Sequence, residues 1–123
     1  MTDLADNFVD GQVGAGTGLR AARCDRCGRH QFPHRAECPA CLAPTVEVLL
    51  EGPARLVVST TIEHPPPGGK VEVPYYVGVA EFPEGIRVIG LLTDRLPYGS
   101  TVRPEVVAPF EGARTFAFAP AER

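Results

Sequence analysis

The stretch Cys24-Asp25-Arg26-Cys27, followed after ten residues by Cys38-Pro39-Ala40-Cys41, decides the fold of this chain. These two pairs contain all four cysteines of the protein. Two Cys-x-x-Cys pairs on either side of a short loop have the spacing of a zinc ribbon, in which each pair forms a tight turn and offers two sulfurs to one ion. Gly28 suits the sharp turn after the first pair, and Pro39 restricts the second turn. The sequence therefore predicts a Cys₄ metal site with Cys24, Cys27, Cys38 and Cys41 as ligands.

Two disulfides are the alternative use of these cysteines, and they would need an oxidising compartment. Residues 1–19 carry three acidic residues and lack the basic and apolar regions of a signal peptide, so the sequence predicts none and a cytoplasmic location. Four thiolates also hold rubredoxin-type iron, which leaves iron as an alternative to zinc. His30 and His34 lie between the pairs, but four thiolates complete the shell without them, and we expect both to face solvent. Because a closed shell has no position for water or substrate, this metal would be structural.

The length of 123 residues allows one ordinary domain, or a small metal module beside a barrel of about 75 residues. A ribbon of about 30 residues buries too little surface to fold without its ion. Glycine and proline, 13 of each, fall between short apolar runs and so separate strands. No apolar run approaches the roughly 20 residues of a membrane-spanning helix, which predicts no membrane association.

The charge balance does not favour nucleic acid as the main partner. The net charge is −3, and four thiolates with one Zn²⁺ would change it to about −5. Residues 48–123 contain nine acidic and seven basic residues and no tryptophan, whereas a barrel that binds single strands needs a basic, aromatic face. We keep single-stranded nucleic-acid binding only as an alternative function, because OB-folds and zinc ribbons can serve it. Rubredoxin-like electron transfer is a second alternative.

The basic residues gather in the ribbon, where Arg29 and Arg35 belong to a set of five arginines set against Asp25 and Glu37. Such a cluster could contact a phosphate, the diphosphate of coenzyme A or an acidic protein surface. Alternatively, these arginines partly offset the thiolate charge and otherwise face water.

The chain reads as all-β, with no helix longer than a turn or two. We expect a flexible polar arm over 1–18, a zinc ribbon over 19–45 and a barrel over 46–123. The clearest strand covers residues 55–64 and alternates with period two, which puts Leu56 and Val58 on the same face. Glycines in the middle of two later strands fit the bends of a small barrel. Five or six such strands predict a Greek-key barrel of the OB type, with an SH3-like barrel as the alternative.

In this order, the motifs resemble those of a known family, the bacterial and archaeal proteins that join a rubredoxin-like zinc ribbon to a C-terminal OB-fold and associate with thiolases. The resemblance covers residues 18–120. Its motifs are the two cysteine pairs, Phe32-Pro33, Gly52 before the long strand, His64-Pro65-Pro66-Pro67, Pro74-Tyr75 and residues 99–102.

The resemblance implies a non-catalytic accessory subunit that binds a thiolase-like protein and helps to form or cover its acyl-CoA site. Thiolase chemistry needs a cysteine nucleophile, and here every cysteine is assigned to the metal, so we expect no catalytic residue. His64 would be a hydrogen-bonding group at the mouth of the CoA tunnel, or a strand-end residue that packs against its loop. The residues expected to contact the partner or acyl-CoA are His64, Pro65, Pro66, Tyr75, Arg29 and Arg35.

Overall fold

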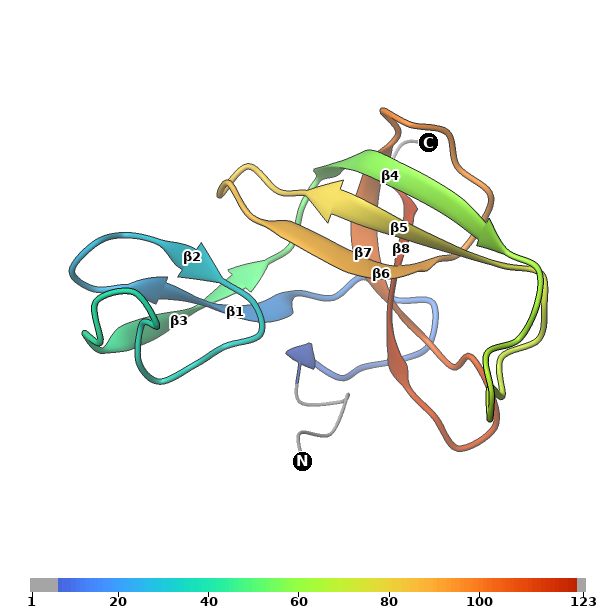
Figure 1. Ribbon diagram of the computed structural model, residues 1–123, viewed down its shortest axis with the longest axis horizontal. Coiled ribbons are helices and arrows are strands. Elements are labelled where there is room, and N and C mark those ends of the chain that lie inside the picture. Colours follow the sequence, from blue (N-terminus) through green and yellow to red (C-terminus); the bar gives the residue numbers. More distant parts are fainter. Residues whose placement is uncertain (1–6, 122–123) are drawn as a thin grey trace.

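A computed structural model of the chain describes residues 7–121 (Figure 1). The fold is all-β, as the sequence predicts, and consists within that range of a three-stranded sheet and a closed five-stranded barrel. The strands are β1 (Leu19–Cys24), β2 (His30–Gln31), β3 (Thr45–Leu50), β4 (Ala54–Ile62), β5 (Tyr75–Glu81), β6 (Arg87–Leu92), β7 (Thr101–Val107) and β8 (Thr115–Pro120). Across the described residues, no helix has the length and apolar character needed to span a bilayer.

The N-terminal sheet has the order β2-β1-β3 and is antiparallel throughout. β3 pairs with β1 over six residues, from Leu19 opposite Leu50 to Cys24 opposite Thr45. The sequence assigned residues 46–50 to the barrel segment, but the structure places them in the ribbon sheet. The pairing explains this placement, because Leu19 and Leu50 are both fully buried at the end of the sheet nearest the barrel.

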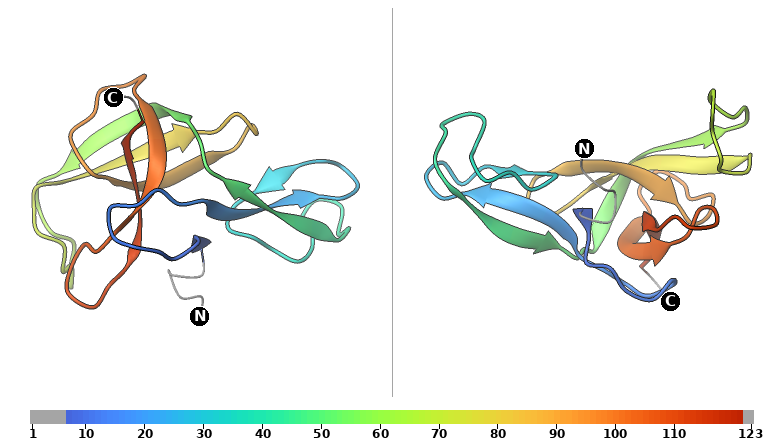
Figure 2. Two further views of the ribbon diagram at one scale, coloured as in Figure 1. Left: turned by 180° about the vertical axis from the view of Figure 1, so that it is seen from behind. Right: turned by 90° about the horizontal axis from the view of Figure 1, so that it is seen from below.

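The C-terminal strands close into a barrel with the order β4-β5-β6-β8-β7. β6 and β8 are parallel, and the other neighbours are antiparallel. This order, with its single parallel pair between the third and fifth strands, is the Greek-key arrangement of an OB-fold, and it excludes the SH3-like alternative. The two further views in Figure 2 show the barrel and the ribbon as neighbouring units joined through β3.

A β-bulge in β4 changes the face to which its side chains point. The register shifts between Leu56 and Val58, which pair with Ala80 and Val79 of β5. Leu56 is fully buried, whereas Val58 is 49% exposed. The expectation that these two residues share a face is therefore wrong, because the extra residue of a bulge reverses the alternation that follows it.

Two mid-strand glycines, Gly78 and Gly90, lie directly opposite each other in β5 and β6. A Cβ atom on Gly78 would lie 2.6 Å from the carbonyl oxygen of Val58, and one on Gly90 would lie 2.8 Å from the Phe116 ring. Neither distance is compatible with a side chain, so these glycines leave room for the backbone of the neighbouring strand β4 and for the Phe116 ring of the neighbouring strand β8.

The ribbon and the barrel share one hydrophobic core. Phe8, which precedes β1, is only 1% exposed, and its ring packs edge-on against Phe116 at a centroid distance of 6.4 Å. Phe32 of the ribbon packs against the same ring at 5.9 Å. The ribbon therefore rests on the open end of the barrel and helps to close it.

Residues 7–18, the described part of the expected flexible arm, pack along the edge of β7. Gly14 and Thr17 donate backbone hydrogen bonds to the carbonyls of Val106 and Pro104, and Val106 donates to Ala15. The arm thus covers a strand edge that would otherwise be unpaired. Residues 1–6 of the expected arm lie outside the described part of the chain, as do the last two residues of the expected barrel.

Candidate functional site

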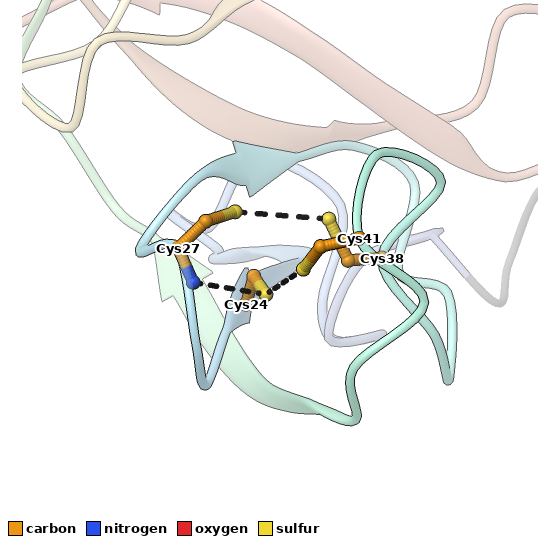
Figure 3. Close-up of side chains that lie close together, drawn as sticks. All are labelled: Cys24, Cys27, Cys38 and Cys41. Carbon is orange, nitrogen blue, oxygen red and sulfur yellow. Dashed lines mark hydrogen bonds between the residues drawn. The ribbon is translucent and has the colours of Figure 1, made fainter.

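The four cysteines come together at the end of the ribbon away from the barrel (Figure 3). Cys24 ends β1, Cys27 follows in the turn, and Cys38 and Cys41 lie in the loop before β3. All four Sγ atoms lie within 4.8 Å of one another. The two pairs, ten residues apart in the sequence, therefore lie in one cluster.

Each cysteine pair sits on a turn of the same construction. The backbone N–H of Gly28 donates to the carbonyl of Cys24 at 3.1 Å, and the N–H of Leu42 donates to that of Cys38 at 2.8 Å. Gly28 and Leu42 both have left-handed backbone angles, with φ of 74° and 63°. Glycine adopts this conformation freely, but leucine does so at a cost of about 1–2 kcal/mol. The second turn is therefore held by its surroundings.

The sulfur geometry fits one tetrahedral ion. The Sγ atoms of Cys24 and Cys41 are 3.2 Å apart, and those of Cys27 and Cys38 are 3.8 Å apart. An S–S bond of about 2.05 Å is excluded at these distances. Four thiolates at about 2.3 Å from Zn²⁺ stand roughly 3.8 Å apart at the corners of a tetrahedron. The donor set and its spacing thus suit zinc, and the same shell would also hold iron.

Backbone donors prepare these thiols for a cation. The pKa of Cys24 is lowered to about 6, mainly because the N–H groups of Cys27 and Arg26 point at its sulfur, each at 3.3 Å. Donation from Cys41 and Ala40 lowers the pKa of Cys38 in the same way. The N–H of Ala43 acts on Cys41 in that direction too, but the proton shared with Cys24 and burial together raise the pKa of Cys41. A bound ion would replace this shared proton and hold all four groups as thiolates.

The two ribbon histidines stand outside this cluster, which among the described residues consists of cysteines alone. His34 is exposed and His30 is half-buried in β2. The expectation that both face solvent holds for His34 and is wrong for His30, because pairing with Arg23 of β1 places His30 in the sheet.

The residues expected to contact a partner or acyl-CoA form two separate groups. His64, Pro65 and Pro66 are exposed in the loop between β4 and β5, and Tyr75 is half-buried where β5 begins. Arg29 and Arg35 are exposed in the ribbon. Figure 1 shows the ribbon and the β4–β5 loop at opposite ends of the long axis, so the structure does not unite these groups in one site.

The surface between these two ends has hollows that the sequence did not reveal. A groove of about 860 Å³ runs along β4 from Val57 to Thr61 and is closed on its other side by residues 95–98. A neighbouring groove of about 500 Å³ shares Arg95 and includes Tyr76. No local feature of the sequence indicates that residues 95–98 lie beside β4.

Comparison with known proteins covers both modules. Residues 18–47 match the family described as "ChsH2, rubredoxin-like zinc ribbon domain", and residues 47–107 match "ChsH2, C-terminal OB-fold domain". A "DUF35 domain-containing scaffold protein" of Methanocaldococcus jannaschii is 30% identical over 94 residues, which cover 75% of this chain and 67% of that relative.

Solved structures give the same result. The structure titled "Ltp2-ChsH2(DUF35) aldolase" superposes with a TM-score of 0.69 and 25% identity, over 85% of this chain and 86% of that one. A DUF35 family protein of unknown function from Sulfolobus solfataricus shares the fold, with a TM-score of 0.56 and 18% identity over 84% of this chain and 75% of its own. The ribbon, the OB barrel and their order in the sequence all match, and the chain therefore belongs to the ChsH2-type DUF35 family, in which a rubredoxin-like zinc ribbon precedes a C-terminal OB-fold domain.

Proposed function

We propose that this chain is a non-catalytic accessory subunit that binds a thiolase-type enzyme and helps to form or cover its acyl-CoA site. One observation carries the proposal: both modules match the structure named "Ltp2-ChsH2(DUF35) aldolase". The match covers 85% of this chain. The relative named as a scaffold protein supports the same role.

The chemistry of the chain supports a non-catalytic role. All four cysteines converge on one closed cluster, so none is free to form an acyl thioester. Ser59 gives its hydroxyl proton to the carbonyl of Leu96, and Ser100 gives its own to the carbonyl of Pro97. Neither serine hydroxyl is thus paired with a general base, and a metal in the cysteine cluster would have no open position for substrate.

The acyl-CoA part of the proposal rests on the loop between β4 and β5. His64, Pro65 and Pro66 project from the barrel as an exposed, stiff segment, and Tyr75 stands at its base. Such a segment can extend over the active-site entrance of a docked enzyme. The exposed Arg29 and Arg35 lie too far along the molecule to serve the same entrance, so we assign them to a separate contact with an acidic surface or a phosphate.

The direct test is affinity capture of the tagged chain from its native cells, followed by mass spectrometry and measurement of stoichiometry. A thiolase-type enzyme recovered in a fixed ratio would support the proposal. A nuclease-treated sample of the same preparation is the control, because an enzyme bound directly to the chain stays bound after nucleic acid is removed. Recovery of nucleic acid without any thiolase-type enzyme would instead support the single-stranded nucleic-acid alternative.

A further inference from the structure

The outer face of the β4–β5–β6 sheet carries side-chain rows that are almost entirely apolar. In one row, Val58, Val79 and Ile89 lie side by side across the three strands. In the next row, Thr60 lies beside Val77 and Leu91. Figure 1 shows these three strands adjacent to one another on the barrel wall. We call the two rows together the docking face.

The docking face is open to solvent at its edges. Ile89 is 67% exposed and Val58 is 49% exposed, while Val77, Val79 and Leu91 are half-buried between them. The bulge in β4 produces this exposure, because it directs Val58 outward to stand beside Val79. A contiguous apolar group on a sheet face is typical of a surface that is covered by another protein.

A groove extends the docking face on the β4 side. Val58 and Thr60 belong both to the docking face and to the groove of about 860 Å³ that residues 95–98 close. Beyond Leu56, no backbone hydrogen bond joins this edge of β4 to any other element in the described chain. The docking face is therefore continuous with the open edge of β4, so the surface of one partner can cover both.

Two arginines beside the docking face, Arg55 and Arg95, have no ion-pair partner among the described residues, although Glu63 lines one groove with Arg95. Arg55 donates to the Tyr98 hydroxyl at 3.1 Å and lies over its ring, but among the described residues it forms no ion pair. Arg95, which lines the groove, also lacks an ion pair within the described range. The row next to the docking face consists of Arg55, Glu81 and Arg87 across the same three strands. Its one acidic residue, Glu81, already binds Arg87 at 3.3 Å.

We infer that the docking face is where this chain binds the thiolase-type enzyme of the proposed function, on which this inference rests. The enzyme would bring an apolar surface bordered by carboxylates that pair with Arg55 and Arg95. A second copy of this chain fits less well, since its own two docking rows contain no carboxylate and Glu81 in the row beside them already pairs with Arg87. The occupant is therefore a different chain, with carboxylates around an apolar surface.

The test compares three charge substitutions in the binding of the chain to the thiolase-type enzyme that co-purifies with the wild type. Ile89→Glu places a charge on the most exposed apolar residue of the docking face and should weaken binding at least about 30-fold, the effect of losing an interface hot spot. Arg95→Glu should also weaken it, with a loss that shrinks at high salt. Val13→Glu is the matched control, because Val13 is an aliphatic residue, 50% exposed, on the N-terminal segment and outside both the docking face and the cysteine cluster. Binding of this variant should stay within about twofold of wild type.

Thermal unfolding of each free variant shows that it is folded, and Arg95→Glu remains a test if Ile89→Glu does not fold. A wild-type complex that tolerates Ile89→Glu and Arg95→Glu, or that Val13→Glu disrupts instead, would overturn the docking face and leave the proposed function standing. Dimers of the wild type that Ile89→Glu dissociates would also overturn it, by identifying a second copy as the occupant. If the wild type binds no thiolase-type enzyme, the proposed function fails and the inference fails with it.

Discussion

Phe8 lies where the N-terminal segment, the ribbon and the barrel meet, and its ring is almost completely buried against Phe116. Replacement by alanine would leave a cavity between the two modules, because the surrounding strands are fixed by their own pairing. We expect Phe8→Ala to lower the free energy of unfolding by about 3–5 kcal/mol. Denaturant unfolding of the zinc-loaded protein, at a fixed free zinc concentration, measures this change.

Val13 provides the control for this prediction. It lies in the same segment but is 50% exposed, so Val13→Ala should change stability by less than about 0.5 kcal/mol. Equal, small effects of both substitutions would mean that the N-terminal segment does not pack against the barrel in solution.

Leu42 is the one non-glycine residue with a left-handed backbone among those described. Its side chain is largely exposed, so replacement by glycine removes strain and little packing. We expect Leu42→Gly to raise the free energy of unfolding by up to about 1 kcal/mol, less the added flexibility of the unfolded chain. Thermal unfolding measures this change, and Leu42→Ala, which keeps the backbone strain, is the control. An increase in stability from alanine equal to or larger than that from glycine would contradict the assignment of strain to Leu42.

At the scale of the elements, the ribbon depends on its metal and the barrel depends on the ribbon. β1 and β3 carry Leu19 and Leu50 into the common core, and their far end is fixed by the cysteine cluster. Loss of the ion should therefore disturb both modules, because an unfolded ribbon would expose the open end of the barrel.

We predict that Cys24→Ser abolishes stoichiometric zinc binding and unfolds the ribbon, since serine does not supply the fourth thiolate. Zinc content by elemental analysis and the thermal midpoint of unfolding check this together. His34→Ala is the control, because His34 is exposed and lies outside the cluster, and it should keep full zinc. A Cys24→Ser protein with full metal content and unchanged stability would contradict the structural role of the site.

Most of the elements could be predicted from the sequence, because their signals are local. The cysteine pairs give the metal site, and period-two alternation bounded by glycine and proline gives strands close to those observed. β4, for example, covers Ala54–Ile62, close to the strand expected at residues 55–64. The bulge in β4 escaped prediction because it depends on pairing with β5, and a sequence that alternates Leu56, Val58 and Thr60 contains no sign of the inserted residue.

At the scale of the whole molecule, contacts between segments far apart in the chain could not be predicted from the sequence. Glycine-rich residues 11–18 read as flexible, yet their backbone pairs with β7, whose residues lie about 90 positions further along. The same limit applies to the candidate surfaces. The ligands of the metal site were predictable from spacing, whereas the docking face arises only when three strands align their outward residues.

In the proposed function, this chain acts through the active site of another enzyme. The most direct measurement is the steady-state rate of acyl-CoA conversion by the purified thiolase-type partner, alone and with added chain, beside the chain alone. We predict no turnover by the chain alone, and a higher kcat/KM of the partner that saturates at the stoichiometric ratio of the complex. Turnover by the chain alone, or a partner whose kcat/KM is unchanged by the chain, would contradict the account.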